Sequence, residues 1–179
     1  MNWDLVDWSI IGPAMAAGLL VLSTHVPLGQ VVLQRGIIFI DLAIAQVAAL
    51  GVIAADSLGW EENTYAVQVA AVSAALLAAA GLHWTERHWP DIQEALIGTL
   101  FILAATGSVL LLAENPHGGD YLKDILVGQI LWTTWDMLIP VAVLYAVLLA
   151  VWFLGRERLG RAVFYGTFAF AVTAAVQIV

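Results

Sequence analysis

Two polar side chains stand inside GIIFIDLAIAQVAALG (residues 36–51), a stretch that is otherwise apolar. Asp41 carries a carboxylate and Gln46 an amide, and because the chain has no cysteine, any metal site must use such oxygen donors or histidine. An ionised carboxylate at the centre of a membrane helix costs about 2.5–3.5 kcal/mol, so it normally faces protein or water. We therefore expect Asp41 either to line an ion path or, as a structural residue, to cap its helix or hydrogen-bond to a neighbouring helix.

Gln46 follows Asp41 by five residues, which places the two side chains about 140° apart on a regular α-helix. A π-bulge between them would restore a common face, whereas a regular helix over 38–50 excludes one. Taken alone, Gln46 is also explained by a hydrogen bond across a helix interface. Small residues around the pair predict a central helix in close contact with its neighbours: Ala43, Ala45, Ala48, Ala49 and Gly51.

The histidines differ in how well their surroundings suit a metal ligand. His25 lies near the end of the first apolar run and is either a ligand or an interfacial side chain with its polar tip at the membrane surface. His117, in the turn ENPHGGD, is a further candidate ligand for an arriving cation. His83, Glu86 and His88, in HWTERHWPD, match no standard zinc spacing, and we interpret this segment as an ordinary membrane boundary.

The composition shows which elements must position these residues. Of the 179 residues, 62% are hydrophobic and 11% are charged, whereas about a quarter are charged in a soluble domain. The apolar residues form blocks of roughly 20, the length that crosses a bilayer core. We expect an all-α polytopic membrane protein, one domain over 1–179, with a short interfacial helix near 120–135 and about six transmembrane helices at 9–29, 36–55, 65–84, 92–113, 137–154 and 162–179.

Charge indicates the orientation in the membrane. Five of the six basic residues fall in alternate connections, after the first, third and fifth runs: Arg35, Arg87, Arg156, Arg158 and Arg161. The positive-inside rule places these connections in the cytoplasm, with the N-terminus outside a plasma (inner) membrane. The net charge of −8 disfavours nucleic acid as a partner, and the bilayer is the expected surroundings.

Three segments, in order over residues 27–139, resemble the zinc/manganese permease family of ATP-binding-cassette transporters. The first is the opening stretch with VPLGQVVLQR before it, where Pro27-Leu28-Gly29, Arg35, Asp41 and Gly51 keep the family's places. The second is EALIGTLFILAATGSVLLL, from Glu94. The third is Tyr121-Leu122 with Gly128-Gln129-Ile130-Leu131.

The resemblance implies a membrane permease subunit that passes a divalent metal ion, zinc or manganese, and is not itself an enzyme. It implies three protein partners: an extracytoplasmic metal-binding protein, a cytoplasmic ATP-binding subunit and a second copy of the permease. This chain would bind no cofactor, because ATP is used by the partner. Asp41 would line the path, with Gln46 where the family has a histidine, which favours a harder ion such as manganese or a path without a tight site.

Two departures from the family pattern lead to further expectations. The segment GRERLGR (residues 155–161) is shorter than the family's cytoplasmic docking segment, so an ATPase would dock on another surface. The family continues beyond AFAVTAAVQIV, so we expect a chain truncated at its C-terminal end and incomplete relative to the family. The alternative function is a structural or assembly subunit of a membrane complex without its own transport path, in which Asp41 and Gln46 only stabilise helix packing.

Overall fold

The computed structural model describes residues 8–60, 64–113, 118–127 and 130–176. Within these ranges every regular element is helical, and no strand occurs. The elements are α1 (Trp8–Arg35), α2 (Ile40–Ser57), α3 (Thr64–His88), α4 (Gln93–Leu111), α5 (Gly118–Val127) and α6 (Trp135–Val176), with short 3-10 turns η2 (Pro90–Ile92) and η3 (Ile130–Trp132). The predicted all-α class is confirmed.

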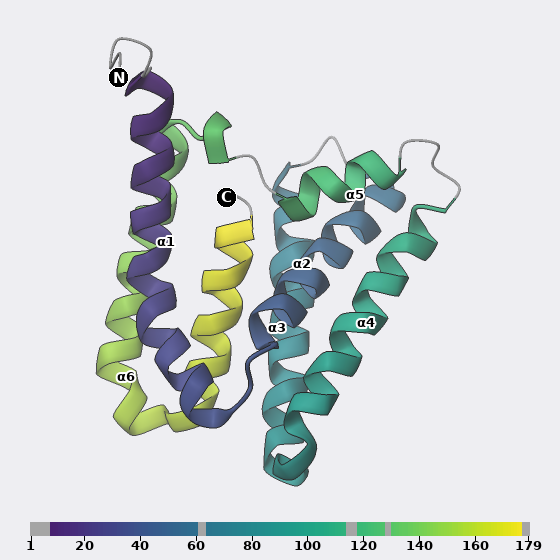
Figure 1. Cartoon of the computed structure of the whole chain (residues 1–179), viewed down its shortest axis with the longest axis vertical. Helices are drawn as coiled ribbons and strands as arrows, with labels where there is room; N and C mark the ends of the chain where they lie inside the picture. The colour runs from purple at the N-terminus through teal and green to yellow at the C-terminus, as the bar shows by residue number, and fades with distance from the viewer. Residues whose placement is uncertain (1–7, 61–63, 114–117, 128–129, 177–179) are drawn as a thin grey trace, which may run out of the picture.

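Five helical segments among the described residues are long and apolar enough to cross a membrane. They are Trp8–Arg35, Ile40–Ser57, Tyr65–His88, Pro90–Leu111 and Trp135–Gly155. The sixth expected helix, at 162–179, is present as a shorter apolar helix, Ala162–Val176. The expected interfacial helix near 120–135 corresponds to α5 and η3, and Figure 1 shows α5 lying across one end of the bundle.

The first connection differs from its prediction. Helix α1 continues through Pro27 and Gly29 to Arg35, because a single glycine does not end a helix. The stop is Gly36, whose φ of 68° lies in the left-handed region that glycine adopts without strain. As a result α2 begins at Ile40, four residues later than expected, and Asp41 lies in its first turn.

Helix α6 turns back on itself at Gly160, where φ is 56° and ψ is −132°. We call Trp135–Gly155 its first limb and Ala162–Val176 its second limb. The second limb, yellow in Figure 1, returns between α1 on one side and α2 and α3 on the other. The hydroxyl of Tyr145 in the first limb donates a hydrogen bond of 3.0 Å to the carbonyl oxygen of Ala171 in the second.

Helix α2 is central, as the small residues predicted, and packs against α3, α4, α5 and α6. Its closest approach is to α3, where Gly51 lies against Ala70, Ala71 and Ala74. The connections that carry Arg35 and Arg87, and the turn at Gly160, all lie at the lower end of the bundle in Figure 1, opposite α5. The connections predicted to be cytoplasmic therefore share one end.

Candidate functional site

Asp41 and His25, predicted separately, are brought together from two helices. Asp41 is exposed on the surface of the single chain, in the first turn of α2, and it interacts electrostatically with His25 of α1. The positive end of the α2 dipole also favours a carboxylate there, and Phe39 at the helix start supplies no side-chain cap. Both expected roles of Asp41, in an ion path and at a helix start, are therefore compatible with its position.

The surroundings of His25 favour a proton on one of its two ring nitrogens. His25 Nδ1 lies 3.0 Å from the carbonyl oxygen of Val21 and 3.2 Å from the hydroxyl of Thr24. Because a carbonyl only accepts hydrogen bonds, we assign the proton of the neutral ring to Nδ1, which leaves the lone pair on Nε2. A histidine held through Nδ1 by a backbone carbonyl is oriented as metal-binding histidines commonly are.

Two fully buried hydroxyl side chains lie beside this pair. Thr24 and Tyr145 both have no exposed surface, and their hydroxyl groups interact with each other. Tyr145 also interacts electrostatically with Asp41. We call Thr24, His25, Asp41 and Tyr145 the Asp41 cluster.

Gln46 does not belong to the Asp41 cluster. Its side chain is 5% exposed, and α2 is a regular α-helix from Ile40 onward, without a π-bulge. Asp41 therefore faces outward and Gln46 inward, as a spacing of five residues requires. His117 lies outside the described residues. Among the residues that are described, no three His, Asp or Glu side chains are grouped so that they could hold a metal ion.

A second polar cluster lies at the lower end of the bundle and was not predicted. Arg35 Nη1 lies 3.4 Å from Glu86 Oε1, and the Arg35 guanidinium stands 4.6 Å from the centre of the Phe164 ring. These contacts join the end of α1, the last turns of α3 and the second limb of α6. We call the whole group the Arg35 cluster: Arg35, His83, Glu86, Gln93, Phe164 and Tyr165.

Gln93 connects α4 to this cluster. Its Nε2 donates to the carbonyl oxygen of Leu82 at 2.8 Å and to the hydroxyl of Tyr165 at 3.3 Å, while its Oε1 accepts from the hydroxyl of Thr85 at 2.9 Å. The ring of His83 lies 5.5 Å from that of Tyr165. Since Gln93 is only 3% exposed, its hydrogen bonds form inside the protein.

The segment HWTERHWPD, interpreted from the sequence as a membrane boundary, also takes part in helix packing. His88 is exposed and stacks on Trp84, with 4.6 Å between ring centres. His83 and Glu86 are instead partly buried and contact the second limb of α6. The sequence signal was their spacing of three residues, which places them on one helix face.

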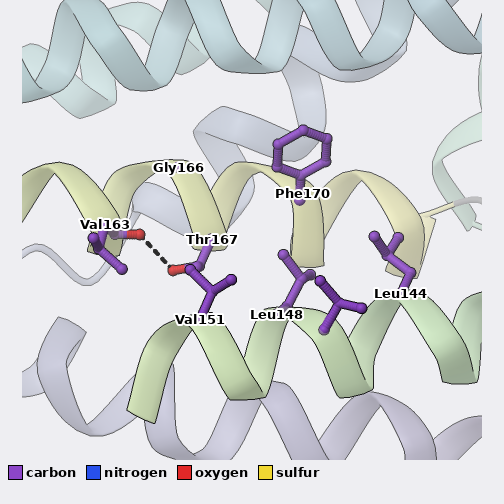
Figure 2. A pocket seen from close by; sticks show the side chains of 8 residues that line it. Leu144, Leu148, Val151, Val163, Gly166, Thr167 and Phe170 are labelled. Atoms are coloured by element: carbon purple, nitrogen blue, oxygen red, sulfur yellow. Dashed lines mark hydrogen bonds between the residues drawn. The ribbon is translucent and has the colours of Figure 1, made fainter. Parts of the chain in front are cut away.

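The cavity drawn in Figure 2 offers no alternative ion site. It has a volume of about 370 Å³ and lies between the two limbs of α6, lined largely by aliphatic side chains such as Leu148 and Val163. The hydroxyl of Thr167, which also lines it, donates to the carbonyl oxygen of Val163 at 2.6 Å. A cavity of this character suits apolar chains rather than a cation.

Comparison with known proteins places the chain in a family. Neither the search of curated proteins nor the search of solved structures gave a match. The sequence does match the model of the ABC 3 transport family, and the match extends over residues 7–179. The part of the chain that the structure describes has five helices of membrane-spanning length, in agreement with this match. The chain therefore belongs to the ABC 3 transport family, whose members are membrane permease subunits of ATP-binding-cassette transporters.

Proposed function

We propose that this permease subunit passes a divalent metal ion, zinc or manganese, across the membrane, and that Asp41 and His25 bind the ion on its way. The observation that carries this proposal is the electrostatic interaction of His25 in α1 with Asp41 in α2. One carboxylate oxygen and one imidazole nitrogen are donors that both metals accept. The lone pair on His25 Nε2 supports the same role.

The exposure of Asp41 supports a path rather than a sealed packing contact. A carboxylate in a membrane helix is costly against lipid, so its exposed face requires water or another protein surface. A second copy of the permease would supply such a surface and place the path between the two copies. The remaining partners would be an extracytoplasmic metal-binding protein and a cytoplasmic ATP-binding subunit.

The small number of donors favours transit over storage. Conduction needs binding that is strong enough to admit an ion and weak enough to release it. Two protein ligands, with water completing the shell, meet that need better than a closed three- or four-ligand site. With Gln46 turned inward, the proposed ligands are Asp41 and His25, and His117 remains a proposed ligand for an arriving ion.

The proposed orientation follows the charge distribution. The end that carries Arg35 and Arg87 would face the cytoplasm of a cell with this subunit in its inner membrane, and the start of α1 would lie outside. Because residues 155–161 form a short connection, the ATP-binding subunit would dock on a broader part of that end.

Metal uptake tests the assignment. Cells that carry the complete transporter are loaded with radioactive manganese or zinc, and the permease carries Asp41→Asn or His25→Gln. We expect both variants to reduce metal uptake to nearly that of cells without the permease. The abundance of the variant permease in the membrane should be unchanged. Asp56→Asn, at the other end of α2, is the matched control and should transport normally.

The same experiment distinguishes ion transport from the alternative function of a structural or assembly subunit. In a structural or assembly subunit, Asp41→Asn would lower the amount of assembled complex and leave the uptake of each complex unchanged. Normal uptake by Asp41→Asn and His25→Gln proteins would remove both residues from the path.

A further inference from the structure

The Arg35 cluster contains buried polar atoms that lack hydrogen bonds. In the described part of the chain, three buried side-chain atoms have no hydrogen-bond partner: His83 Nδ1, Glu86 Oε2 and Glu94 Oε2. Most buried polar atoms in proteins have a partner, so an unpaired one often marks a place for water or an ion. Glu94, whose other oxygen accepts from the backbone N–H of Phe39 at 3.1 Å, lies outside the Arg35 cluster, whereas His83 and Glu86 both belong to it.

His83 and Glu86 approach the same neighbour from one face of α3. They are three residues apart, so their side chains lie on the same side of the helix. The His83 ring packs on the Tyr165 ring, and Glu86 interacts with the Tyr165 hydroxyl. One imidazole and one carboxylate thus face the second limb of α6, the same two donor types as in the Asp41 cluster.

Arg35 already contacts one oxygen of the Glu86 carboxylate. Its guanidinium contacts Glu86 Oε1, and the side chains of Arg35 and Glu86 are 24% and 12% exposed. Arg35 therefore reaches water more readily than Glu86 does. A divalent ion at Glu86 Oε2 would be repelled by a guanidinium only a few ångströms away, so ion and guanidinium compete for one carboxylate.

The two clusters lie along one helix. The second limb meets the Asp41 cluster at Ala171, through Tyr145, and the Arg35 cluster at Tyr165. Six residues of α-helix separate these contacts, which corresponds to about 9 Å. The Arg35 cluster is the one at the lower end of the bundle, next to the connections with basic residues.

We propose that His83 and Glu86 form a second cation-binding site, distinct from Asp41 and His25, and that Arg35 occupies its carboxylate when no ion is present. The ligand class is a divalent metal ion with affinity for nitrogen and oxygen donors. The identity of this ion with the transported ion rests on the proposed function. Binding of a metal ion at His83 and Glu86 does not depend on that function. In this arrangement Arg35 keeps the site closed to ions until the guanidinium moves toward water.

Cobalt titration of the purified full chain tests the site, because the visible absorption of Co²⁺ reports its ligands. The Asp41→Asn protein serves as background so that the first site does not contribute. Adding Arg35→Gln should raise cobalt affinity about tenfold or more, because it removes the competing charge. Adding Glu86→Gln or His83→Gln to that protein should abolish binding.

Two control variants distinguish the effect of the Arg35 charge from that of its packing. Arg35→Lys keeps the positive charge and should bind cobalt as weakly as the background protein. Arg87→Gln removes the exposed charge next to Glu86 in the chain and should change nothing. If Arg35→Gln does not yield folded protein, the background protein at high cobalt concentration is compared with its Glu86→Gln variant, and only the former should bind.

Some results would overturn the proposal. Absence of cobalt binding in folded Arg35→Gln protein would show that the unpaired atoms hold water alone. Binding that persists without both Glu86 and His83 would place the metal elsewhere. Neither result depends on whether Asp41→Asn affects uptake, so the two proposals fail separately.

Discussion

Gly51 of α2 and Ala74 of α3 meet so closely that a methyl group on Gly51 would overlap its neighbour. A Cβ added to Gly51 would lie 2.8 Å from Ala74 Cβ and 2.9 Å from the carbonyl oxygen of Ala70. Membrane helices approach to this extent only where both carry small residues. The contact fixes α2 against α3 and so positions the first turn of α2, where Asp41 lies.

Gly51→Ala should therefore destabilise the protein. Replacing glycine by alanine in a helix usually gains about 0.5–1 kcal/mol, but overpacking costs about 1–3 kcal/mol. We expect a lower thermal unfolding midpoint of the purified protein in detergent. Gly18→Ala, where an added Cβ meets nothing within 4 Å, is the control and should not lower the midpoint. Equal midpoints for the two variants would contradict the close contact.

Gly160→Ala should destabilise the turn between the two limbs of α6. The φ of 56° and ψ of −132° at Gly160 are strained for any residue with a Cβ, at a cost of about 1–3 kcal/mol. The measurement is again the thermal midpoint. Gly166→Ala, in the regular second limb with nothing within 4 Å of an added Cβ, should be neutral or stabilising. A Gly160→Ala protein as stable as the wild type would rule out this backbone conformation.

Tyr145→Phe should weaken the contact between the limbs. It removes the hydroxyl that donates to the Ala171 carbonyl and leaves that buried acceptor with one partner fewer, at a cost of about 1–3 kcal/mol. Hydrogen exchange of the second limb should become faster. Tyr65→Phe, at a residue that is 86% exposed, should leave exchange unchanged. Unaltered exchange in Tyr145→Phe would show that this hydrogen bond does not hold the limbs together.

Gln93→Leu should loosen the lower end of the bundle. It keeps a similar side-chain size but removes the donor to Leu82 and Tyr165 and the acceptor for Thr85, at a cost of about 1–3 kcal/mol. Limited proteolysis at the α3–α4 connection should become faster. The control is Gln68→Leu, an exposed amide in the apolar part of α3, which should not increase cleavage. Equal cleavage of both variants would argue against the network.

Much of the fold could be predicted because a membrane helix carries its own signal. A block of about 20 apolar residues identifies a span without knowledge of its neighbours. The ends of the helices were harder to predict from the sequence. The segment Pro27-Leu28-Gly29 looks like a break, yet hydrogen bonds of the surrounding turns carry α1 on to Arg35, and only the left-handed φ of Gly36 stops it.

The candidate site was only partly predictable because its members come from distant parts of the chain. Asp41 and His25 each stood out as polar residues in apolar runs, but their interaction depends on how the connection after Arg35 directs the start of α2. Glu86 gave a weaker signal, since its partner Arg35 lies 51 residues away and Tyr165 still further. Long-range packing of this kind leaves no local pattern in a single sequence.

The returning course of α6 has a mechanical consequence. Its second limb contacts Tyr145 through Ala171 and, nearer Gly160, contacts Arg35 through Phe164. A rotation of that limb about Gly160 would therefore shift its contacts with both clusters in one movement. Changes at the Asp41 cluster and at the Arg35 cluster would then be coupled through a single rigid segment.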